Sequence, residues 1–436
     1  MRAGLLVVFA ACYQPSAPAG APCGDGAPCP TGQSCSSNVC ILGDAAEANA
    51  DACVAADRCE GATLVTCAGS VACSHGCDGD HCLTLAPSNG LSSSLLTGAS
   101  ADVSGDKLDF DTDSGKIKGP GNSTLRMQGE GVISDIGFTV IDGMGVFTAH
   151  SFDLGAGAAW TVGGSNTFVL FAATDVAIHG TIDVGALAGN GGPGGRSGGT
   201  TTNDPPCRGL VGLAGAIGFG EGGGGGGGAT AGGNGAPSNA TTFGAGGSLC
   251  ASPSTIPLRG GNGGGAGGVV AATETVRGGR GGGGGGAIAL VAMDEIVVDG
   301  VIGAPGDGGL SLGDGGGGGG GGGAVFLEAP SIVLDGVLTA NGAGGAGPSA
   351  SIGSRGHLGD ATTAAGGQFA GVSGGRGGAG MASPTDGQTS VIGTTAARGG
   401  GGGGAVGRIE LRSVTVTASP AAVESPPATR STAVLQ

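Results

Sequence analysis

Apolar segments return along this chain in a fixed order, and glycine-rich stretches separate one set from the next. Each set contains an apolar segment, a short polar break, a second apolar segment and a His-Gly or Asp-Gly pair. A period of two, typical of β-strands, is visible at Ile288, Leu290 and Ala292. The pattern therefore predicts short strands joined by tight turns. The three clearest sets occupy residues 168–180, 287–300 and 324–336.

Repetition of the whole set predicts the coils of a solenoid. Asp-Gly turns alone would favour hairpins, but a repeated unit can bury its apolar face on the next copy. Coils stacked about 4.8 Å apart would pair their backbones in continuous ladders. Residues 108–166 resemble weaker coils without inserts, and 405–416 repeats the first two strands. We expect an all-β fold with a parallel β-helix over 100–417 and a disordered tail over 418–436.

Glycine supplies 107 of the 436 residues and is concentrated between the strand sets. No Gly-X-Y period is present, which excludes a collagen helix. Each ordered glycine costs roughly 0.5–1 kcal/mol more backbone entropy than alanine. The glycine therefore either stays disordered or packs backbone against backbone. Uninterrupted runs occupy 222–228, 281–286, 315–323 and 399–404.

The inserts between coils favour the packed alternative. They cover roughly 188–286, 303–323 and 340–404, and they carry few charges. Apolar residues such as Leu210 and Ile217 are not needed in a flexible, solvated linker. We expect rods of polyglycine II, a threefold helix that rises about 3.1 Å per residue. A side chain larger than hydrogen would hold such rods apart, which explains the purity of the runs.

The N-terminal residues predict export. Arg2 precedes a nine-residue apolar stretch, which is too short to cross a bilayer. The small residues before Cys12 resemble the lipobox of bacterial lipoproteins, although Phe9 stands where Leu or Val is usual. The resemblance implies a signal peptide over 1–11, a lipidated Cys12 that anchors the chain to a membrane, and a linker over 12–22. An ordinary secretory signal is the alternative, and it too implies export.

Twelve further cysteines, an even number, predict disulfides in an exported chain. Four lie in a module over 23–40, six in a module over 53–82, and two in the first long insert. Modules this small cannot build a hydrophobic core, and the spacings leave their pairing open. Zinc bound near His75 and His81 is the alternative, but the spacing fits no usual zinc motif. The disulfide candidates are Cys23, Cys29, Cys35, Cys40, Cys53, Cys59, Cys67, Cys73, Cys77, Cys82, Cys207 and Cys250.

Acidic residues supply the candidate metal ligands. Asp109, Asp111 and Asp113 alternate, and on a loop they could bind calcium, the one cofactor that the sequence suggests. An EF-hand would need glycine and glutamate where Ser114 and Pro120 stand, so a solvated turn is the alternative.

Charged residues at matching positions of successive coils are further candidates for functional residues. Asp299 and Asp335 would bring like charges together if the coils stack in register, and His179 takes this place in the preceding set. Arg408, Glu410 and Arg412 are spaced by two, so we expect them on one outward face. Groups of this kind on a strand face are what a carbohydrate-active β-helix uses. The sequence offers no Ser/His/Asp set and no HExxH motif. We therefore expect a protein without enzymatic activity.

The amino-acid composition restricts the kinds of binding partner that we expect. A net charge of −16 disfavours nucleic acid, and 3% aromatic residues give little surface for stacking sugars. The leader, the cysteine modules and the repeats resemble glycine-rich surface lipoproteins of myxobacteria, often labelled PGRS-like by composition. The segments that carry the resemblance are 12–15, 22–23 and 29–35; the helical head of mycobacterial PE-PGRS proteins is missing.

The resemblance implies a lipid-anchored chain at the outer membrane or cell surface, and it implies no activity. We expect a structural or adhesive surface protein that contacts another cell, prey or matrix. A β-helix that binds or processes surface polysaccharide and a calcium-stabilised binding module are the alternatives.

Overall fold

The computed structural model describes twelve stretches of the chain, which divides into two compact units, Met1–Cys82 and Leu83–Gln436. No helix within these stretches has the length and apolar character needed to cross a membrane. The described residues are 33–36, 39–42, 57–66, 69–199, 220–237, 243–249, 258–268, 278–312, 314–348, 351–369, 371–392 and 396–436.

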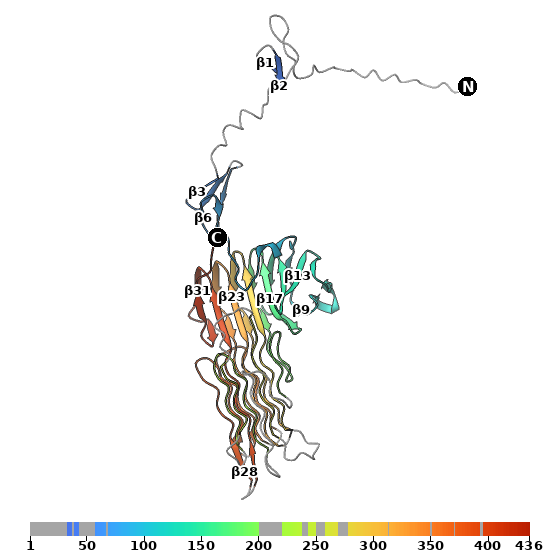
Figure 1. The fold of residues 1–436 in the computed structure, drawn as a ribbon, viewed down its shortest axis with the longest axis vertical. Helices are drawn as coiled ribbons and strands as arrows, with labels where there is room; N and C mark the ends of the chain where they lie inside the picture. Colours follow the sequence, from blue (N-terminus) through green and yellow to red (C-terminus); the bar gives the residue numbers. More distant parts are fainter. Residues whose placement is uncertain are drawn as a thin grey trace, which may run out of the picture. The chain divides into compact units, whose positions relative to one another are not determined.

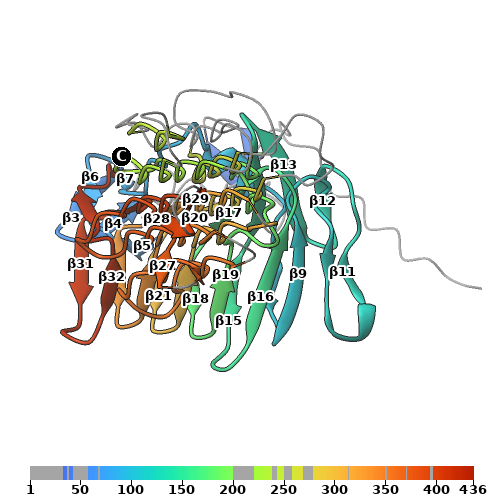
Figure 2. The ribbon, with the colours of Figure 1, turned by 90° about the horizontal axis from the view of Figure 1, so that it is seen from below.

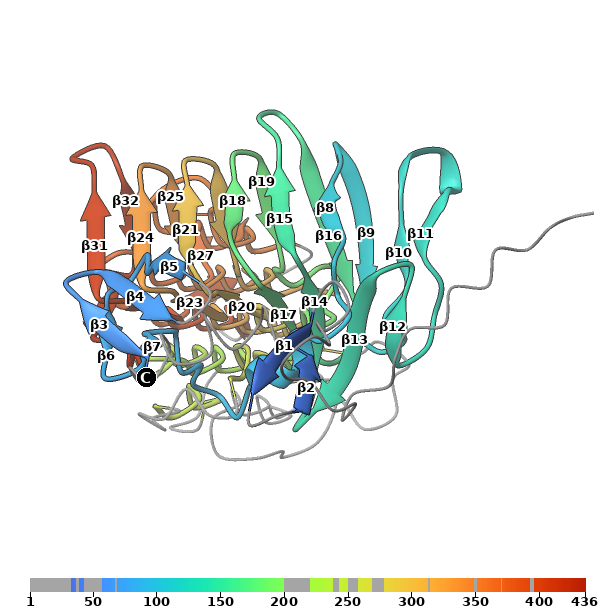
Figure 3. The same ribbon diagram turned by 90° about the horizontal axis from the view of Figure 1, so that it is seen from above.

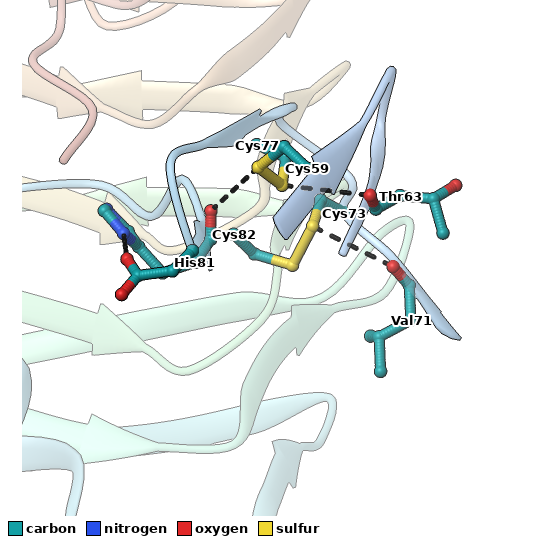
Figure 4. Close-up of a disulfide and its surroundings, with 8 residues drawn as sticks. Cys59, Thr63, Val71, Cys73, Cys77, His81 and Cys82 are labelled. Atoms are coloured by element: carbon teal, nitrogen blue, oxygen red, sulfur yellow. Dashed lines mark hydrogen bonds and ion pairs between the residues drawn. A yellow bond between two sulfur atoms is a disulfide. The ribbon is translucent and has the colours of Figure 1, made fainter. Parts of the chain in front are cut away.

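The first unit consists of small antiparallel sheets. Two disulfides, Cys59–Cys77 and Cys73–Cys82, hold its second module together (Figure 4). They exclude zinc binding by these cysteines, because a bridged sulfur is no thiolate ligand. The strands are β1 (Gln33–Ser36), β2 (Val39–Leu42), β3 (Arg58–Glu60), β4 (Thr63–Thr66), β5 (Gly69–Ala72), β6 (Cys77–Asp78) and β7 (His81–Cys82). Of the other cysteines, Cys35 and Cys40 are backbone partners in the β1–β2 hairpin, and Cys12, Cys23, Cys29, Cys53, Cys67, Cys207 and Cys250 lie outside the described residues.

The second unit contains three long sheets that wrap around one interior, as expected of a parallel β-helix (Figures 2 and 3). Sheet 1 contains β12 (Gly131–Ile133), β13 (Ile136–Ile141), β14 (Met144–Ala149), β17 (Thr167–Ala172), β20 (Ala287–Ala292), β23 (Ala324–Glu328), β30 (Arg408–Arg412) and β33 (Thr429–Ser431). Sheet 2 contains β8 (Asp102–Ser104), β15 (Ser151–Leu154), β18 (Val176–Ile178), β21 (Glu295–Val298), β24 (Ser331–Leu334) and β31 (Thr415–Ala418). Sheet 3 contains β11 (Thr124–Arg126), β10 (Ile117–Lys118), β9 (Lys107–Asp111), β16 (Ala159–Gly163), β19 (Thr181–Asp183), β22 (Val301–Gly303), β25 (Val337–Thr339) and β32 (Val423–Ser425).

Each coil passes through sheets 1, 2 and 3 in turn, and neighbouring coils pair in parallel and in register. Leu170, for example, is the partner of Leu290, which in turn is the partner of Leu327 on the next coil. These side chains are fully buried and belong to one continuous core that runs through the coils. Like residues therefore stack on like, which is why the repeated pattern in the sequence predicts the fold.

The middle strands of sheet 1, β14, β17, β20 and β23, are buried on both faces, unlike those of sheets 2 and 3, which alternate between buried and more exposed positions. The outer face of sheet 1 is covered by residues 83–97, which we call the strap. Leu85 and Leu91 of the strap are buried against this face. The strap also pairs with the last residues of the chain, where Leu85 and Leu435 form an antiparallel bridge. A strand buried on both faces loses its apolar alternation, which accounts for the continuous apolar run of β20.

At the two ends of the solenoid, the structure differs from the arrangement of coils that the sequence predicts. Strands β12 and β13 are antiparallel to each other, and β13 is antiparallel to β14, so residues 133–141 form a terminal meander and no coil. At the opposite end, β32 pairs with β25 and β33 pairs with β30. The expectation of a disordered tail over 418–436 is therefore wrong. These short strands are stable because the preceding coil supplies their partners.

Charged side chains occupy the interior positions at both ends. Arg126 is fully buried and donates hydrogen bonds to four backbone carbonyl oxygens, including that of Gly115 at 2.8 Å. At the other end Glu424 and Arg430 continue the rows of Leu338 and Leu411, and they form an ion pair. Inward-pointing charges of this kind discourage further strands from adding to a sheet.

Candidate functional site: the glycine-rich bundle

The glycine-rich inserts leave the coils after sheet 3 and form a bundle of extended segments beside the solenoid (Figure 1). The second insert is the simplest, because it runs outward over 304–310 and returns over 315–323. Three N–H groups of the returning run, at Gly317, Gly320 and Gly323, donate to carbonyls of the outgoing segment at 2.7–2.9 Å. The spacing of three residues is that of a threefold helix. Other parts of the bundle carry two short hairpins, β26 (Gln368–Phe369) with β27 (Val372–Ser373) and β28 (Thr389–Ile392) with β29 (Ala396–Gly399).

The run 315–323, which we call the central run, is hydrogen-bonded to neighbours on all sides. Its N–H groups donate to three segments, and its carbonyls accept from three others and, at Gly323, from the N–H of Arg408. Successive residues point to different neighbours, and every third residue returns to the same one. The accepting segments are 262–268, 304–310 and 399–405, and the donating segments are 223–226, 279–285 and 343–346. All three inserts therefore contribute to one bundle with the bonding pattern of polyglycine II.

The close approach of neighbouring backbones explains why the central run contains only glycine. A Cβ atom added at any of its nine positions would lie closer than 3.0 Å to a backbone atom of another segment. None of these glycines has the positive φ that side chains avoid, so backbone conformation does not require glycine here. The packing predicted from the purity of the runs is thus present at the centre of the bundle.

Side chains attach the bundle to the coils. Arg355, in the third insert, makes a bidentate ion pair with Asp183 at the end of β19, with both N–O distances at 2.8 Å. The same guanidinium donates to the carbonyl of Ala186 at 3.0 Å. Asn341 is fully buried and donates to the carbonyls of His357 and Asp360 at 2.7 and 2.8 Å. The Arg355 contacts bring the third insert against residues more than a hundred positions earlier, whereas the Asn341 contacts lie within that insert.

Apolar side chains are exposed at the end of the bundle farthest from the coils. Phe243, Leu312 and Ile352 are 42%, 58% and 63% exposed. Leu312 lies in the turn before the central run, and hydrogen bonds from Gly353 to Gly309 and from Gly244 to Gly222 put the other two at the same level. A nine-residue run of polyglycine II spans about 28 Å, so this end is well separated from β23. We call these three residues the far-end apolar group.

The predicted calcium ligands are not brought together. Thr161 donates to Asp109, the backbone N–H groups of residues 113 and 114 donate to Asp111, and Ser165 donates to Asp113 from both its N–H and its hydroxyl at 2.9 Å. Within the described stretches, no group of three His, Cys, Asp or Glu side chains is gathered as for a metal. The structure therefore gives no support to calcium binding by these aspartates, because each carboxylate is used in a separate local contact.

The charged residues at matching places stack as expected. His179 contacts Asp299 of the next coil, with an Nδ1–Oδ1 distance of 2.8 Å, and the strands that precede His179, Asp299 and Asp335 are in register. Arg408, Glu410 and Arg412 point outward from β30, since they alternate with buried Ile409 and Leu411.

Sequence reasoning missed Glu328, a carboxylate on the outer face of sheet 1 that the strap buries. Its side chain is fully buried, and it accepts hydrogen bonds from the N–H and hydroxyl of Ser88 at 2.9 and 2.8 Å. Arg412 lies 3.4 Å away across the strand pair. Burial raises the pKa of the Glu328 carboxyl above its usual value, against the opposing effect of the Ser88 hydrogen bonds. The sequence does contain a signal for Glu328, since a carboxylate ends an otherwise apolar strand. In the structure this residue is where the strap is attached.

Most aromatic rings of the described residues are buried in the second unit. Trp160 and Phe110 are 1% and 2% exposed, and their centroids lie 5.2 Å apart in the core. Buried rings cannot stack on a sugar, which weighs against the polysaccharide alternative. The other buried rings are Phe138, Phe147, Phe152, Phe168, Phe171 and Phe326.

Comparison with known proteins finds no matching family model, no matching curated protein and no matching solved structure.

Proposed function

We propose that this chain is an exported, non-catalytic surface protein that uses its glycine-rich bundle to make contact away from the cell. The hydrogen bonding of the central run to six neighbouring segments carries the proposal. A bundle paired in this way is a stiff support, because no segment can move without breaking bonds to its neighbours. The far-end apolar group gives the support a contact surface, since exposed apolar side chains favour association.

Anchoring through a lipid at Cys12 belongs to the same proposal. The lipobox-like leader and the resemblance to myxobacterial surface lipoproteins support it, and Cys12 itself lies outside the described residues. The two disulfides of the first unit also favour an oxidising compartment. In this arrangement the lipid holds the N-terminal modules at an outer membrane or cell surface, and the bundle meets another cell, prey or matrix.

Attachment of cells that display the full chain tests the contact function. Leu312→Glu with Ile352→Glu should reduce attachment to apolar surfaces and partner cells under flow, because both changes put charge into the far-end apolar group. Leu125→Glu with Val132→Glu is the matched control, since these residues are 38% and 46% exposed but lie on the edge strands β11 and β12 of the solenoid. Equal attachment by both double variants and the parent chain would refute the contact function.

Anchoring has its own test. Cys12→Ala should abolish labelling by a fatty-acid analogue and release the protein from the membrane fraction. Retention of the label in this variant would refute lipid attachment at Cys12, while the attachment assay above would still decide the contact function.

A further inference from the structure

A cleft of about 310 Å³ lies where the last coil of the solenoid meets the glycine-rich bundle. Its walls come from segments far apart in the sequence: residues 229–230 and 380–383 of the bundle, 406–409 at the start of β30, and 426–429 leading into β33. Because the cleft is built from both parts of the second unit, its shape depends on how the bundle is seated on the coils. It is separate from the far-end apolar group.

The walls of the cleft are mainly apolar. Val406 is 5% exposed and Pro426 and Pro427 form part of the lining, while Met381 stands at the cleft with 88% of its surface exposed. Apolar walls favour a ligand with a hydrocarbon body, since burial of apolar area drives binding in such sites.

One charged group can orient a ligand in the cleft. Arg408 is the one charged side chain among the lining residues; it also interacts electrostatically with Glu410, which is not part of the lining.

We propose that the cleft binds a small amphipathic carboxylate, with its hydrocarbon chain against Val406 and the prolines and its carboxylate near Arg408. The cation is complementary to an anionic head group. Octanoate combines a short hydrocarbon chain with a carboxylate and is therefore the probe. The binding site is independent of the proposed contact function.

Titration calorimetry of the full chain with sodium octanoate tests the proposal. We expect saturable binding at one site, and binding of n-octylammonium at least about tenfold weaker because its charge has the wrong sign. Arg408→Gln should weaken octanoate binding by about tenfold or more, since it removes a charged hydrogen-bond donor.

Variants that change the shape of the cleft separate binding in it from general association. Ala382→Trp should abolish octanoate binding by filling the cleft from an exposed position. Met127→Trp is the matched control, because Met127 is 58% exposed beside the end meander, and it should leave binding unchanged. The proposal is overturned by the absence of saturable octanoate binding in the millimolar range, by equal binding of octylammonium, or by full binding in Ala382→Trp. Unfolding curves that match the parent chain verify that each variant is folded.

Discussion

A single methyl group in the middle of the central run should destabilise the protein. Gly319 donates its N–H to Gly402 and accepts from Gly226, both at 2.9 Å, and an added Cβ would collide with the carbonyl oxygen of Ala343. Making room for Gly319→Ala separates these segments. Two buried backbone hydrogen bonds, at about 1–3 kcal/mol each when left unsatisfied, predict a loss of about 2–6 kcal/mol in the free energy of unfolding.

The size of this effect separates a packed bundle from a disordered one. In a disordered insert, alanine would leave the free energy of unfolding nearly unchanged, because the residue would be equally free in the folded and the unfolded state. Gly359→Ala is the matched control in the third insert: no atom lies within 4 Å of its added Cβ, and its φ is not positive.

Denaturant unfolding of the two variants, together with hydrogen exchange of residues 315–323, provides the measurement. We expect slow exchange in the parent chain, and both lower stability and faster exchange in Gly319→Ala. Equal unfolding midpoints for Gly319→Ala and Gly359→Ala, or exchange of the central run as fast as in a free peptide, would refute the packed bundle.

Three further predictions concern the strap, the bundle and the first unit. Because the pKa of Glu328 is raised on folding, its contribution to stability is fully present below the usual glutamate pKa of 4.5 and is lost as pH rises through the folded value; Glu328→Gln should flatten this part of the stability–pH curve, and an unchanged curve would contradict the assignment. Asp183→Asn should lower the free energy of unfolding by about 1–2 kcal/mol, because it breaks the half-exposed bidentate pair with Arg355, whereas Asp335→Asn, at an exposed turn, should stay near zero. Cys59→Ser with Cys77→Ser should cost the first unit about 2–4 kcal/mol, seen as faster proteolysis before residue 83 with an unchanged melting temperature of the second unit; equal proteolysis rates would argue against a stabilising bridge.

The coils could be predicted from the sequence because each strand set repeats the same turn. His179-Gly180 and Asp299-Gly300 end their sets in the same way, so the register of the parallel sheets follows from aligning these pairs. The end meander could not be predicted in this way. Antiparallel and parallel strands share a side-chain period of two, so β13 is indistinguishable from a coil strand by its pattern.

Long-range contacts account for the other differences. The strap has no strand periodicity, yet Leu91 is buried because sheet 1 offers it an apolar outer face. Strands β32 and β33 have only three residues each, too few for a pattern, and earlier coils provide their partners. The spacing of Asp109 and Asp113 indicated a shared ligand, but Thr161 and Ser165 of the neighbouring coil bind them separately. In each case the deciding partner is distant in the sequence.

The hydrogen bonding of the central run also has a consequence for when the bundle can assemble during synthesis of the chain. Its partners come from both earlier and later parts of the chain, and 399–405 is the last of them to be synthesised. Until that segment arrives, the N–H groups of Gly316, Gly319 and Gly322 have only solvent as a partner. Contacts of such sequence separation form slowly, so this side of the bundle can close only after residue 405 has been synthesised.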